Sequence, residues 1–248
     1  MEIEWDLNNN VNSNGIANIT NNVDRITDRI EFGLSIIPVS SQKIPFKPWS
    51  EYQSNISPIS LWHSHYINQG TIGIITGKIS GNLECIDVDV KNDPERTIMK
   101  EFSAIIPDEL LKKLIIQSTP NKGFHLIYRC PETVIEPNQK LAWDTSKEVI
   151  IETRGEGGYF CTNKVNNKIL QGIFNLEALD IEIPIITPEE RNLLLEAARS
   201  LTRYFPAVTD NKSKNDKQFV YSEPAINDFN NKYSIIDLFI KHNWTVVQ

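Results

Sequence analysis

The middle of the sequence alternates short apolar runs with turns that contain glycine, and this pattern restricts the possible folds more than any other feature. The runs are rich in Val, Ile and Leu, as strands are, and they cover residues 71–76, 83–90, 114–117, 124–129, 149–153 and 159–162. Asp93 and Pro94 open a helix-like segment after the second run. The last two runs are expected to pair as a hairpin across the glycines between them. The pattern predicts an α+β or mixed α/β core.

Further elements are expected on both sides of this core. Residues 34–39 resemble a strand, and Ser57 followed by Pro58 is typical of a helix start. Residues 187–190 (TPEE) form a capping box with proline at the first helical position, so a helix is expected to run to about Tyr204.

Composition divides the chain into four parts. Residues 1–22 are rich in asparagine and are expected to be a flexible leader, and residues 23–206 are expected to form the folded unit. Residues 207–224 are polar and are typical of a linker. Residues 225–248 are expected to begin a helical segment of a longer protein, truncated at Gln248.

The net charge of −7 argues against a protein that coats nucleic acid by bulk electrostatics, because that mode needs an excess of Lys and Arg. No apolar run approaches the ~20 residues that cross a bilayer, and the N-terminus lacks a signal core, so we expect no membrane contact and a cytoplasmic protein. Cys85, Cys130 and Cys161 lie in apolar runs without zinc-ligand spacing. They are predicted to be buried, reduced thiols, and no zinc is expected.

Asp87 and Asp89 lie two apart in the apolar run of residues 86–90 (IDVDV). The two-residue period of a strand puts both carboxylates on one face, while the apolar residues face the core. Such a pair, held on a rigid strand, is an arrangement that binds Mg²⁺ or Mn²⁺. A strand with its acids in water would look the same, so the pair alone leaves both interpretations open.

Glu152 supplies a third carboxylate, and the same period places it beside Arg154 on one strand face. A metal ligand and a guanidinium able to grip phosphate would then be neighbours. The glycines that follow, in residues 155–158 (GEGG), allow close backbone approach to a ligand, although a plain hairpin has the same composition.

His125 begins the strand after the turn at residues 119–123 (TPNKG), and Lys122 lies in that turn. An imidazole there can donate a hydrogen bond to a triphosphate, and the lysine adds a positive charge. Singly, each residue is more often structural or solvated. The presence of three acidic residues and an arginine in the same set of strands favours a phosphate-binding role for His125 and Lys122.

Three stretches in this order resemble the successive motifs of the primase-polymerase (prim-pol) branch of the archaeo-eukaryotic primase superfamily, as found at the N-terminus of phage and plasmid primase-helicase replication proteins. They are residues 87–89 (DVD), 118–125 (STPNKGFH) and 152–159 (ETRGEGGY). The lead-in at residues 37–49 and 73–77 is also similar. Two positions depart from the pattern: Glu152 stands where aspartate is commoner, and Gly123 where many relatives have a small hydroxyl residue.

The resemblance implies a fold with an RRM-like palm half, an N-terminal α/β half, and the active site in the cleft between them. It implies Asp87, Asp89 and Glu152 as ligands of two Mg²⁺ or Mn²⁺ ions and, with His125, as the catalytic residues. His125, Arg154 and Lys122 are the implied nucleotide-binding residues.

The implied activity is that of a DNA-directed primase-polymerase, a nucleotidyltransferase that joins NTPs or dNTPs along a single-stranded DNA template. It would extend a primer strand or start one, in the replication of a phage, plasmid or related element. A helicase domain is expected in the full-length protein.

Other classes remain possible from the sequence. A two-metal nuclease or a Toprim-like enzyme also uses an Asp-x-Asp pair, although that fold has its additional glutamate on an earlier strand. A glycosyltransferase with the same pair is a weaker alternative, since nothing else indicates a sugar acceptor. A non-catalytic module that binds replication-origin DNA is the alternative from a different class.

Overall fold

The computed structural model of this chain describes residues 33–93, 95, 97–177 and 180–204. The chain divides into two compact units, Met1–Phe205 and Pro206–Gln248, and every described residue belongs to the first. The predicted leader, linker and C-terminal helical segment lie outside the described residues.

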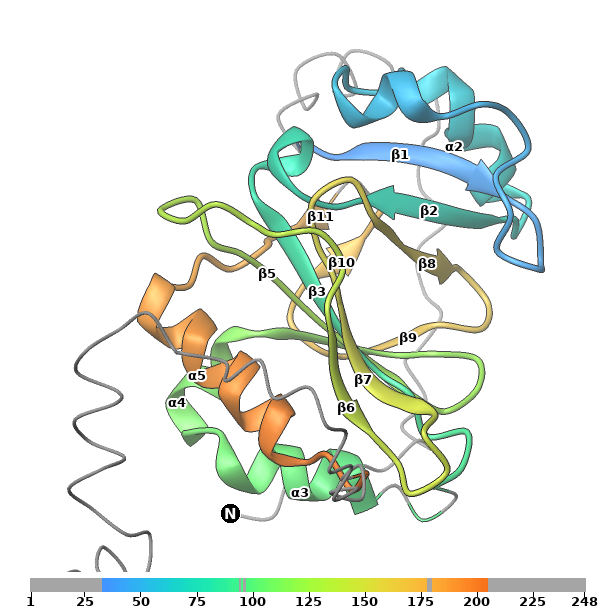
Figure 1. Ribbon diagram of the computed structural model, residues 1–248. Coiled ribbons are helices and arrows are strands. Elements are labelled where there is room, and N and C mark those ends of the chain that lie inside the picture. The colour runs from blue at the N-terminus through green and yellow to red at the C-terminus, as the bar shows by residue number, and fades with distance from the viewer. Residues whose placement is uncertain (1–32, 94, 96, 178–179, 205–248) are drawn as a thin grey trace, which may run out of the picture. The chain divides into compact units, whose positions relative to one another are not determined.

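A six-stranded sheet in the order β6-β7-β3-β5-β4-β9 forms the centre of the described unit (Figure 1). Every neighbouring pair is antiparallel. The strands are Leu83–Val88 (β3), Ile115–Ser118 (β4), Phe124–Arg129 (β5), Lys140–Trp143 (β6), Val149–Arg154 (β7) and Lys168–Gln171 (β9). Because β3 is paired along both edges, any side chain on it has a rigid base.

A smaller antiparallel sheet has the order β1-β2-β8, and a two-stranded ribbon joins β10 to β11. These strands are Ser35–Val39 (β1), Thr71–Ile75 (β2), Tyr159–Asn163 (β8), Phe174–Asn175 (β10) and Asp180–Ile181 (β11). The predicted strand at residues 34–39 is therefore confirmed. The two sheets share a buried cluster in which Ile74 and Phe160 of the small sheet meet Ile127 of the large one.

The predicted hairpin between the last two apolar runs is wrong. β7 pairs with β3 and β6, so both of its edges are occupied, and β8 pairs with β2 instead. The turn between β7 and β8 is held by Thr76, whose amide donates to the carbonyl of Gly158 at 3.0 Å and whose hydroxyl donates to the carbonyl of Gly155. The glycine turn thus carries the chain from one sheet to the other.

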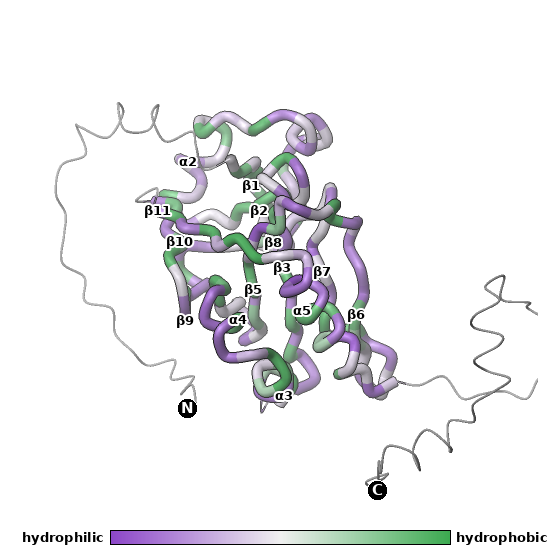
Figure 2. Tube along the Cα trace, turned by 90° about the vertical axis from the view of Figure 1, so that its left-hand side faces the viewer, coloured by the Kyte–Doolittle hydropathy of each residue, from purple (hydrophilic) through white to green (hydrophobic). Residues whose placement is uncertain are grey.

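Helices cover the outer faces of these sheets. They comprise the α-helices Ile59–Ile67 (α2), Thr97–Ile105 (α3), Asp108–Lys113 (α4) and Pro188–Ser200 (α5) and the 3₁₀ turns Ser50–Gln53 (η3) and Lys78–Ser80 (η4). α3, α4 and α5 lie together on one face of the large sheet (Figure 1), where Phe102, Leu111 and Leu194 form a buried cluster with Ile86 and Val88 of β3. Hydrophobic stretches accordingly run along β3 and β5 in the interior (Figure 2).

Helix starts follow local side-chain chemistry. The predicted capping box is confirmed, since Thr187 Oγ1 accepts from the Glu190 amide and Glu190 Oε2 accepts from the Thr187 amide. α3 begins at Thr97, and the Asp93 carboxylate accepts from the Ile98 amide at 2.8 Å and from the Thr97 hydroxyl at 2.7 Å in its first turn.

The predicted combination of helices and sheets in an α+β unit is confirmed. Cys85 and Cys130 are buried, Cys161 is half-buried, and none of them forms a disulfide in the described part. Of the helices described, none is long and apolar enough to cross a membrane.

Candidate active site

Four polar side chains form a row across the face of the large sheet opposite α3, α4 and α5. In the strand register, Asp87 of β3 faces Glu152 of β7 on one side and His125 of β5 on the other. His125 in turn faces Gln117 of β4. Cross-strand partners point to the same side of a sheet, so residues distant in sequence become neighbours.

Arg154 binds both acids of this row. Its Nη2 lies 3.0 Å from Asp87 Oδ2 and 2.6 Å from Glu152 Oε1. The prediction that Glu152 and Arg154 share a strand face is confirmed. The positively charged guanidinium lies between the two carboxylates. Arg154 thereby offsets the repulsion between the acids.

Burial and charge set the ionisation of these groups. Burial alone would raise the pKa of Asp87, but His125 and Arg154 outweigh it and hold the pKa below its usual value. For Arg154, burial lowers the pKa, and Asp87 and Glu152 more than compensate, so that its pKa lies above the usual value. Both groups are therefore charged at neutral pH.

His125 is held in place from three directions, and its side chain is only 4% exposed. Its Nδ1 donates to the amide oxygen of Gln117 at 3.1 Å, and Gln117 donates in turn to Thr162 of β8 at 2.8 Å. The imidazole ring meets the ring of Phe160 edge-on. Burial lowers the pKa of His125, although Asp87 opposes this. The opposite nitrogen, Nε2, lies 3.7 Å from Asp87 Oδ1.

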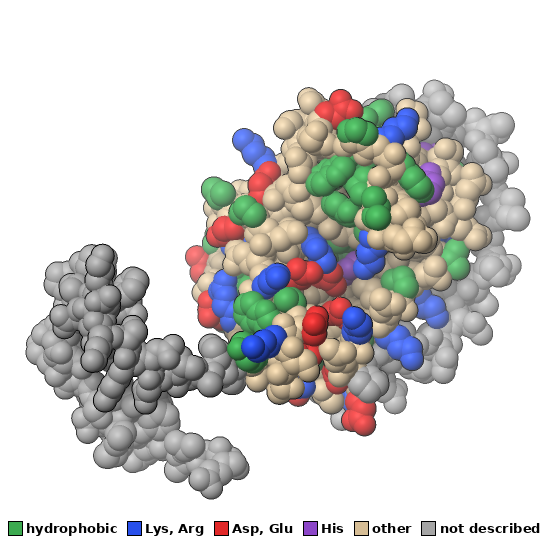
Figure 3. Space-filling model, turned by 45° about the vertical axis from the view of Figure 1, so that its right-hand side comes forward, with side chains coloured by type: hydrophobic (Ala, Val, Ile, Leu, Met, Phe, Trp, Pro, Cys, Tyr) green, Lys and Arg blue, Asp and Glu red, His purple; other side chains and the backbone are tan. Residues whose placement is uncertain are grey.

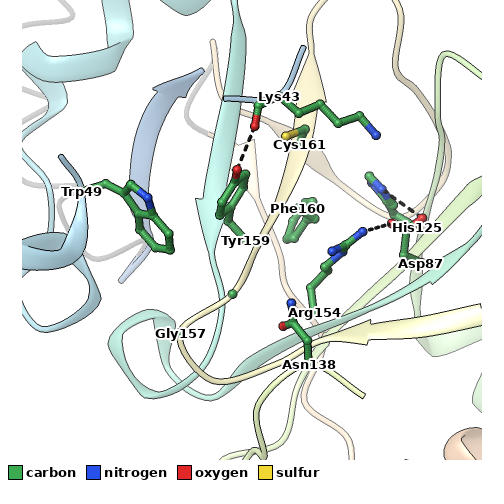
Figure 4. A pocket seen from close by; sticks show the side chains of 11 residues that line it. Lys43, Trp49, Asp87, His125, Asn138, Arg154, Gly157, Tyr159, Phe160 and Cys161 are labelled. Atoms are coloured by element: carbon green, nitrogen blue, oxygen red, sulfur yellow. Dashed lines mark hydrogen bonds and ion pairs between the residues drawn. The ribbon is translucent and has the colours of Figure 1, made fainter. Parts of the chain in front are cut away.

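Two adjoining cavities open above this row. The larger, of about 290 Å³, lies between the sheets, with Asp87, His125 and Arg154 on the large-sheet side and Tyr159, Phe160 and Cys161 of β8 on the other. Figure 4 shows Arg154 and His125 directed at Asp87, with the Tyr159 ring across the space.

The smaller cavity, of about 100 Å³, is lined by all three predicted metal ligands, Asp87, Asp89 and Glu152. Asp89 follows the last residue of β3, yet its amide still donates to the carbonyl of Ile150, so it continues the ladder. One of its carboxylate oxygens accepts from the Lys91 amide at 2.8 Å.

Sequence reasoning placed Asp87, His125, Glu152 and Arg154 in one site, and the structure brings them together. Lys122, in contrast, is exposed in its turn and does not line either cavity, so its role in nucleotide binding stays a prediction. Thr119 and Asn121 of that turn line the smaller cavity instead.

Position 123, where this chain departs from the commoner pattern, has no room for a side chain. A Cβ at this position would lie 2.5 Å from the carbonyl oxygen of Val88 and 3.1 Å from Thr119 Oγ1. The turn therefore runs tightly against the end of β3, next to the acidic pair. Glycine allows that approach.

Lys43 is a candidate site residue to which the sequence gave no role. It lines both cavities, and it forms no ion pair among the residues that the structure describes. Its backbone adopts a left-handed φ of 65°, and its carbonyl accepts from the Tyr159 hydroxyl at 2.8 Å. No spacing in the sequence links Lys43 to Asp87. Only the pairing of β2 with β1 and β8 brings its loop to the site.

Asn138 is another lining residue that the sequence did not single out. Its Oδ1 accepts from the Gly155 amide at 2.9 Å, and it lies beside Arg154 in the larger cavity (Figure 4). The hydrogen bond fixes the first residue after the strand that carries Arg154.

The residues present fit a divalent cation in the chemistry of their donors. Carboxylate oxygens are the ligands that Mg²⁺ and Mn²⁺ prefer, and three of them line one small cavity. Within the described ranges, no three His, Cys, Asp or Glu side chains are already grouped as a finished metal site. Arg154 instead contacts two of the three acids.

These features define a class of protein: an α+β unit with a carboxylate site between two sheets, next to the basic side chains of Arg154 and Lys43, which can bind phosphate. The family model for the N-terminal domain of bifunctional DNA primase/polymerase (Prim-Pol) matches residues 27–165. The match covers more than half of the chain, and the chain belongs to this family. The predicted resemblance is thus confirmed. A search of curated proteins found no match.

Family membership points to DNA primase or polymerase activity, with DNA and nucleotides as substrates. The matched region includes Lys43, Asp87, His125 and Arg154, so the site described above lies within the family's domain.

Proposed function

We propose that this chain is a template-directed nucleotidyltransferase that joins nucleotides on single-stranded DNA with the help of two Mg²⁺ or Mn²⁺ ions. The observation that carries the proposal is the row of Glu152, Asp87 and His125 across three paired strands, with Arg154 bound to both acids. In this proposal the large sheet is the palm half of a primase-type fold. The small sheet with α2 belongs to the second half.

Asp87, Asp89 and Glu152 are the proposed ligands of the ions. When bound, the ions would activate the attacking 3′-hydroxyl and stabilise charge on the leaving pyrophosphate. Asp87 is ionised and lies on a strand paired along both edges, so its carboxylate is held at a fixed place in the sheet.

The cations around the row are the proposed phosphate-binding groups. Arg154 offers a planar fork that can grip phosphate oxygens in two places, and Lys43 places an ammonium between the two cavities. His125 presents Nε2 from a ring already oriented by Gln117. Lys122 adds charge from the turn beside β5. No covalent enzyme intermediate is required, since positioning and charge stabilisation supply the catalysis.

The arrangement also suggests what the larger cavity holds. Its wall combines Arg154 and His125 with the aromatic rings of Trp49, Tyr159 and Phe160. A nucleotide has both an anionic triphosphate and an apolar ring face, and this wall complements both. The proposed setting is the replication of a phage, plasmid or related element, with a primer strand and a helicase domain as partners.

The proposal is tested by incubating the chain with a single-stranded DNA template, labelled nucleotides and Mg²⁺ or Mn²⁺, with and without a primer. We expect labelled products longer than the primer that depend on the metal and on the template. Asp87→Asn should lower their rate by about 10⁴-fold, because the substitution removes the negative charge of a proposed metal ligand but keeps the shape of the side chain. Products formed without a primer would show that the chain also primes.

Glu148→Gln is the matched control, since Glu148 is an exposed carboxylate in the turn before β7 and does not line either cavity. It should synthesise at the wild-type rate. Shortening of the template in place of extension would identify a nuclease and overturn the proposal. DNA binding without any product would instead indicate a non-catalytic module.

A further inference from the structure

The loop after β1 presents large apolar side chains to water beside the candidate site. Ile44 is 63% exposed and Phe46 is 59% exposed, and the exposed Lys47 follows. We call these three residues the rim patch. Single exposed hydrophobic residues are common on protein surfaces, but a pair next to a cation, in a loop whose neighbouring residues line the cavities, is a candidate binding surface.

The rim patch stands on a rigid support. Ser40 and Ile44 are joined by a hydrogen bond of 2.8 Å from the Ser40 amide to the Ile44 carbonyl, and the Phe46 amide donates to Pro38 of β1. Pro45 forms a bridge with Val39, the last residue of β1. The exposure of Ile44 and Phe46 is therefore built into a folded hairpin. Ile44 and Phe46 flank Pro45 on the two sides of this bridge.

The ring of Phe46 is also oriented before any ligand arrives. It meets the ring of His65 on α2 at a centroid distance of 5.4 Å and an angle of 84°. His65 is fixed in turn by a 2.9 Å hydrogen bond to the carbonyl of Thr71. A ring packed on one side and open on the other is suited to stacking, because little side-chain freedom remains to be lost.

The same loop leads directly into the candidate site. Lys43, which precedes the rim patch, lines both cavities, and Trp49, which follows it, lines the larger one. The Tyr159 hydroxyl, which bonds the Lys43 carbonyl, ties the loop to β8. Figure 3 shows one face of the molecule on which hydrophobic side chains gather next to a cluster of acidic and basic groups. A strand lying over the rim patch would continue into the cavity.

We propose that the rim patch binds the unpaired template strand, with a base stacked on Phe46, its neighbour against Ile44, and the backbone phosphate near Lys47. This inference rests on the proposed function, which requires a single strand to reach the cavity. The chain has a net charge of −7, so a strand cannot be held by overall charge and needs local stacking and single cations.

The test measures binding of a fluorescein-labelled oligo(dT) of about 16 nucleotides to the full chain by fluorescence anisotropy, without nucleotide or divalent metal. Phe46→Ala should raise Kd by about tenfold, because base stacking on an aromatic ring is lost. Phe46→Trp should bind at least as tightly as wild type. Phe46→Leu, which stays apolar but cannot stack, should resemble Phe46→Ala. Lys47→Ala should reduce the slope of log Kd against log salt by about 0.7, as expected for one phosphate contact.

Ile44→Ser has a matched control in Ile185→Ser. Ile185 is 65% exposed and is bridged to Arg129, at the opposite end of β5 from His125. Ile44→Ser should weaken binding severalfold, and Ile185→Ser should not change it. Melting temperatures of all variants should match wild type, since these side chains are exposed.

Wild-type affinity in both Phe46→Ala and Ile44→Ser would overturn the inference. So would a wild-type dimer, seen by sedimentation, that becomes a monomer in these variants without a change in DNA binding, since the patch would then hold a second copy. The assay contains no nucleotide, so it separates the two proposals. A chain that binds the strand through Phe46 but makes no product would overturn the proposed function alone.

Discussion

Strand β3 carries two pairings of a carboxylate with arginine, one on each face of the large sheet. On the helix-covered face, Glu84 accepts from Arg191 of α5 at 2.6 and 3.0 Å. On the opposite face, Asp87 accepts from Arg154 at 3.0 Å. Both pairs use the same chemical groups within three residues of one strand, so their differences show what separates a structural ion pair from a candidate site.

The pairs differ in how deeply they are buried. Glu84 is fully buried and also accepts from the Tyr128 hydroxyl at 2.8 Å, while Arg191 bonds Glu136 as well. Neither Glu84 nor Arg191 is among the residues that line the two cavities. This enclosed pair lies away from both cavities, and it joins α5 to the sheet.

The pair at Asp87 is open by comparison. The Asp87 side chain is 17% exposed and that of Arg154 is 28% exposed, and both residues line the two cavities. Arg154 divides its hydrogen bonds between Asp87 and Glu152, so each acid keeps oxygen lone pairs for another partner. We infer that a partly exposed ion pair at a cavity wall is a better indicator of function than an enclosed one.

The largest effect that would test this contrast is on stability. Arg191→Met should lower the free energy of unfolding by about 3–5 kcal/mol, because it leaves Glu84 charged and buried without its partner. Urea denaturation followed by circular dichroism measures the loss.

The double variant Glu84→Gln with Arg191→Met is the control for this prediction. Removing both charges should recover at least about 2 kcal/mol relative to Arg191→Met alone, since no unpaired charge remains buried. If Arg191→Met costs less than about 1 kcal/mol, the Glu84 pair is not the structural element described here.

The next effect is on activity and concerns the open pair. Arg154→Lys keeps the positive charge but removes the planar fork, so kcat/KM for the nucleotide should fall by about 10- to 100-fold. Stability should change by less than about 0.5 kcal/mol, because the site is partly exposed and a cation still faces Asp87. Primer extension at varied nucleotide concentration and thermal melting are the two measurements.

A loss of stability in Arg154→Lys as large as that in Arg191→Met would contradict the contrast. Arg199→Lys is the matched control: Arg199 lies on α5, is paired with Glu196, and does not line either cavity. Its kcat/KM should equal that of wild type.

The features that the sequence could predict depend on neighbouring residues or on the two-residue period of a strand. The two-residue period placed Glu152 beside Arg154, and the capping box at Thr187 located the start of α5. The motif resemblance pointed to the family that the family model then matched. Each of these predictions rests on contacts between residues close in the chain or on motifs that follow one another in a fixed order.

What the sequence missed depends on which strands become neighbours. After β7 the chain turns at Gly155 and enters β8, which pairs with β2 because both edges of β7 are already paired. No local feature of the sequence indicates that competition between strands. Lys43 enters the site through the same tertiary pairing. Arg191 reaches Glu84 across 107 positions, so the enclosed ion pair was also invisible from spacing.

The smallest effect concerns the helix that carries Arg191. Thr187→Ala removes the hydroxyl that accepts from the Glu190 amide at 3.2 Å, and stability should fall by about 1 kcal/mol, as for other helix caps. Thr145→Ala, in an exposed turn between β6 and β7, is the matched control and should be neutral in urea denaturation. The cap lies on the helix-covered face of the large sheet, away from the candidate site. Nucleotide incorporation by Thr187→Ala should therefore stay at the wild-type rate under conditions where the protein is folded. A fall in kcat without unfolding would show that α5 transmits strain through β3 to Asp87, and the two faces of the strand would then be coupled rather than separate.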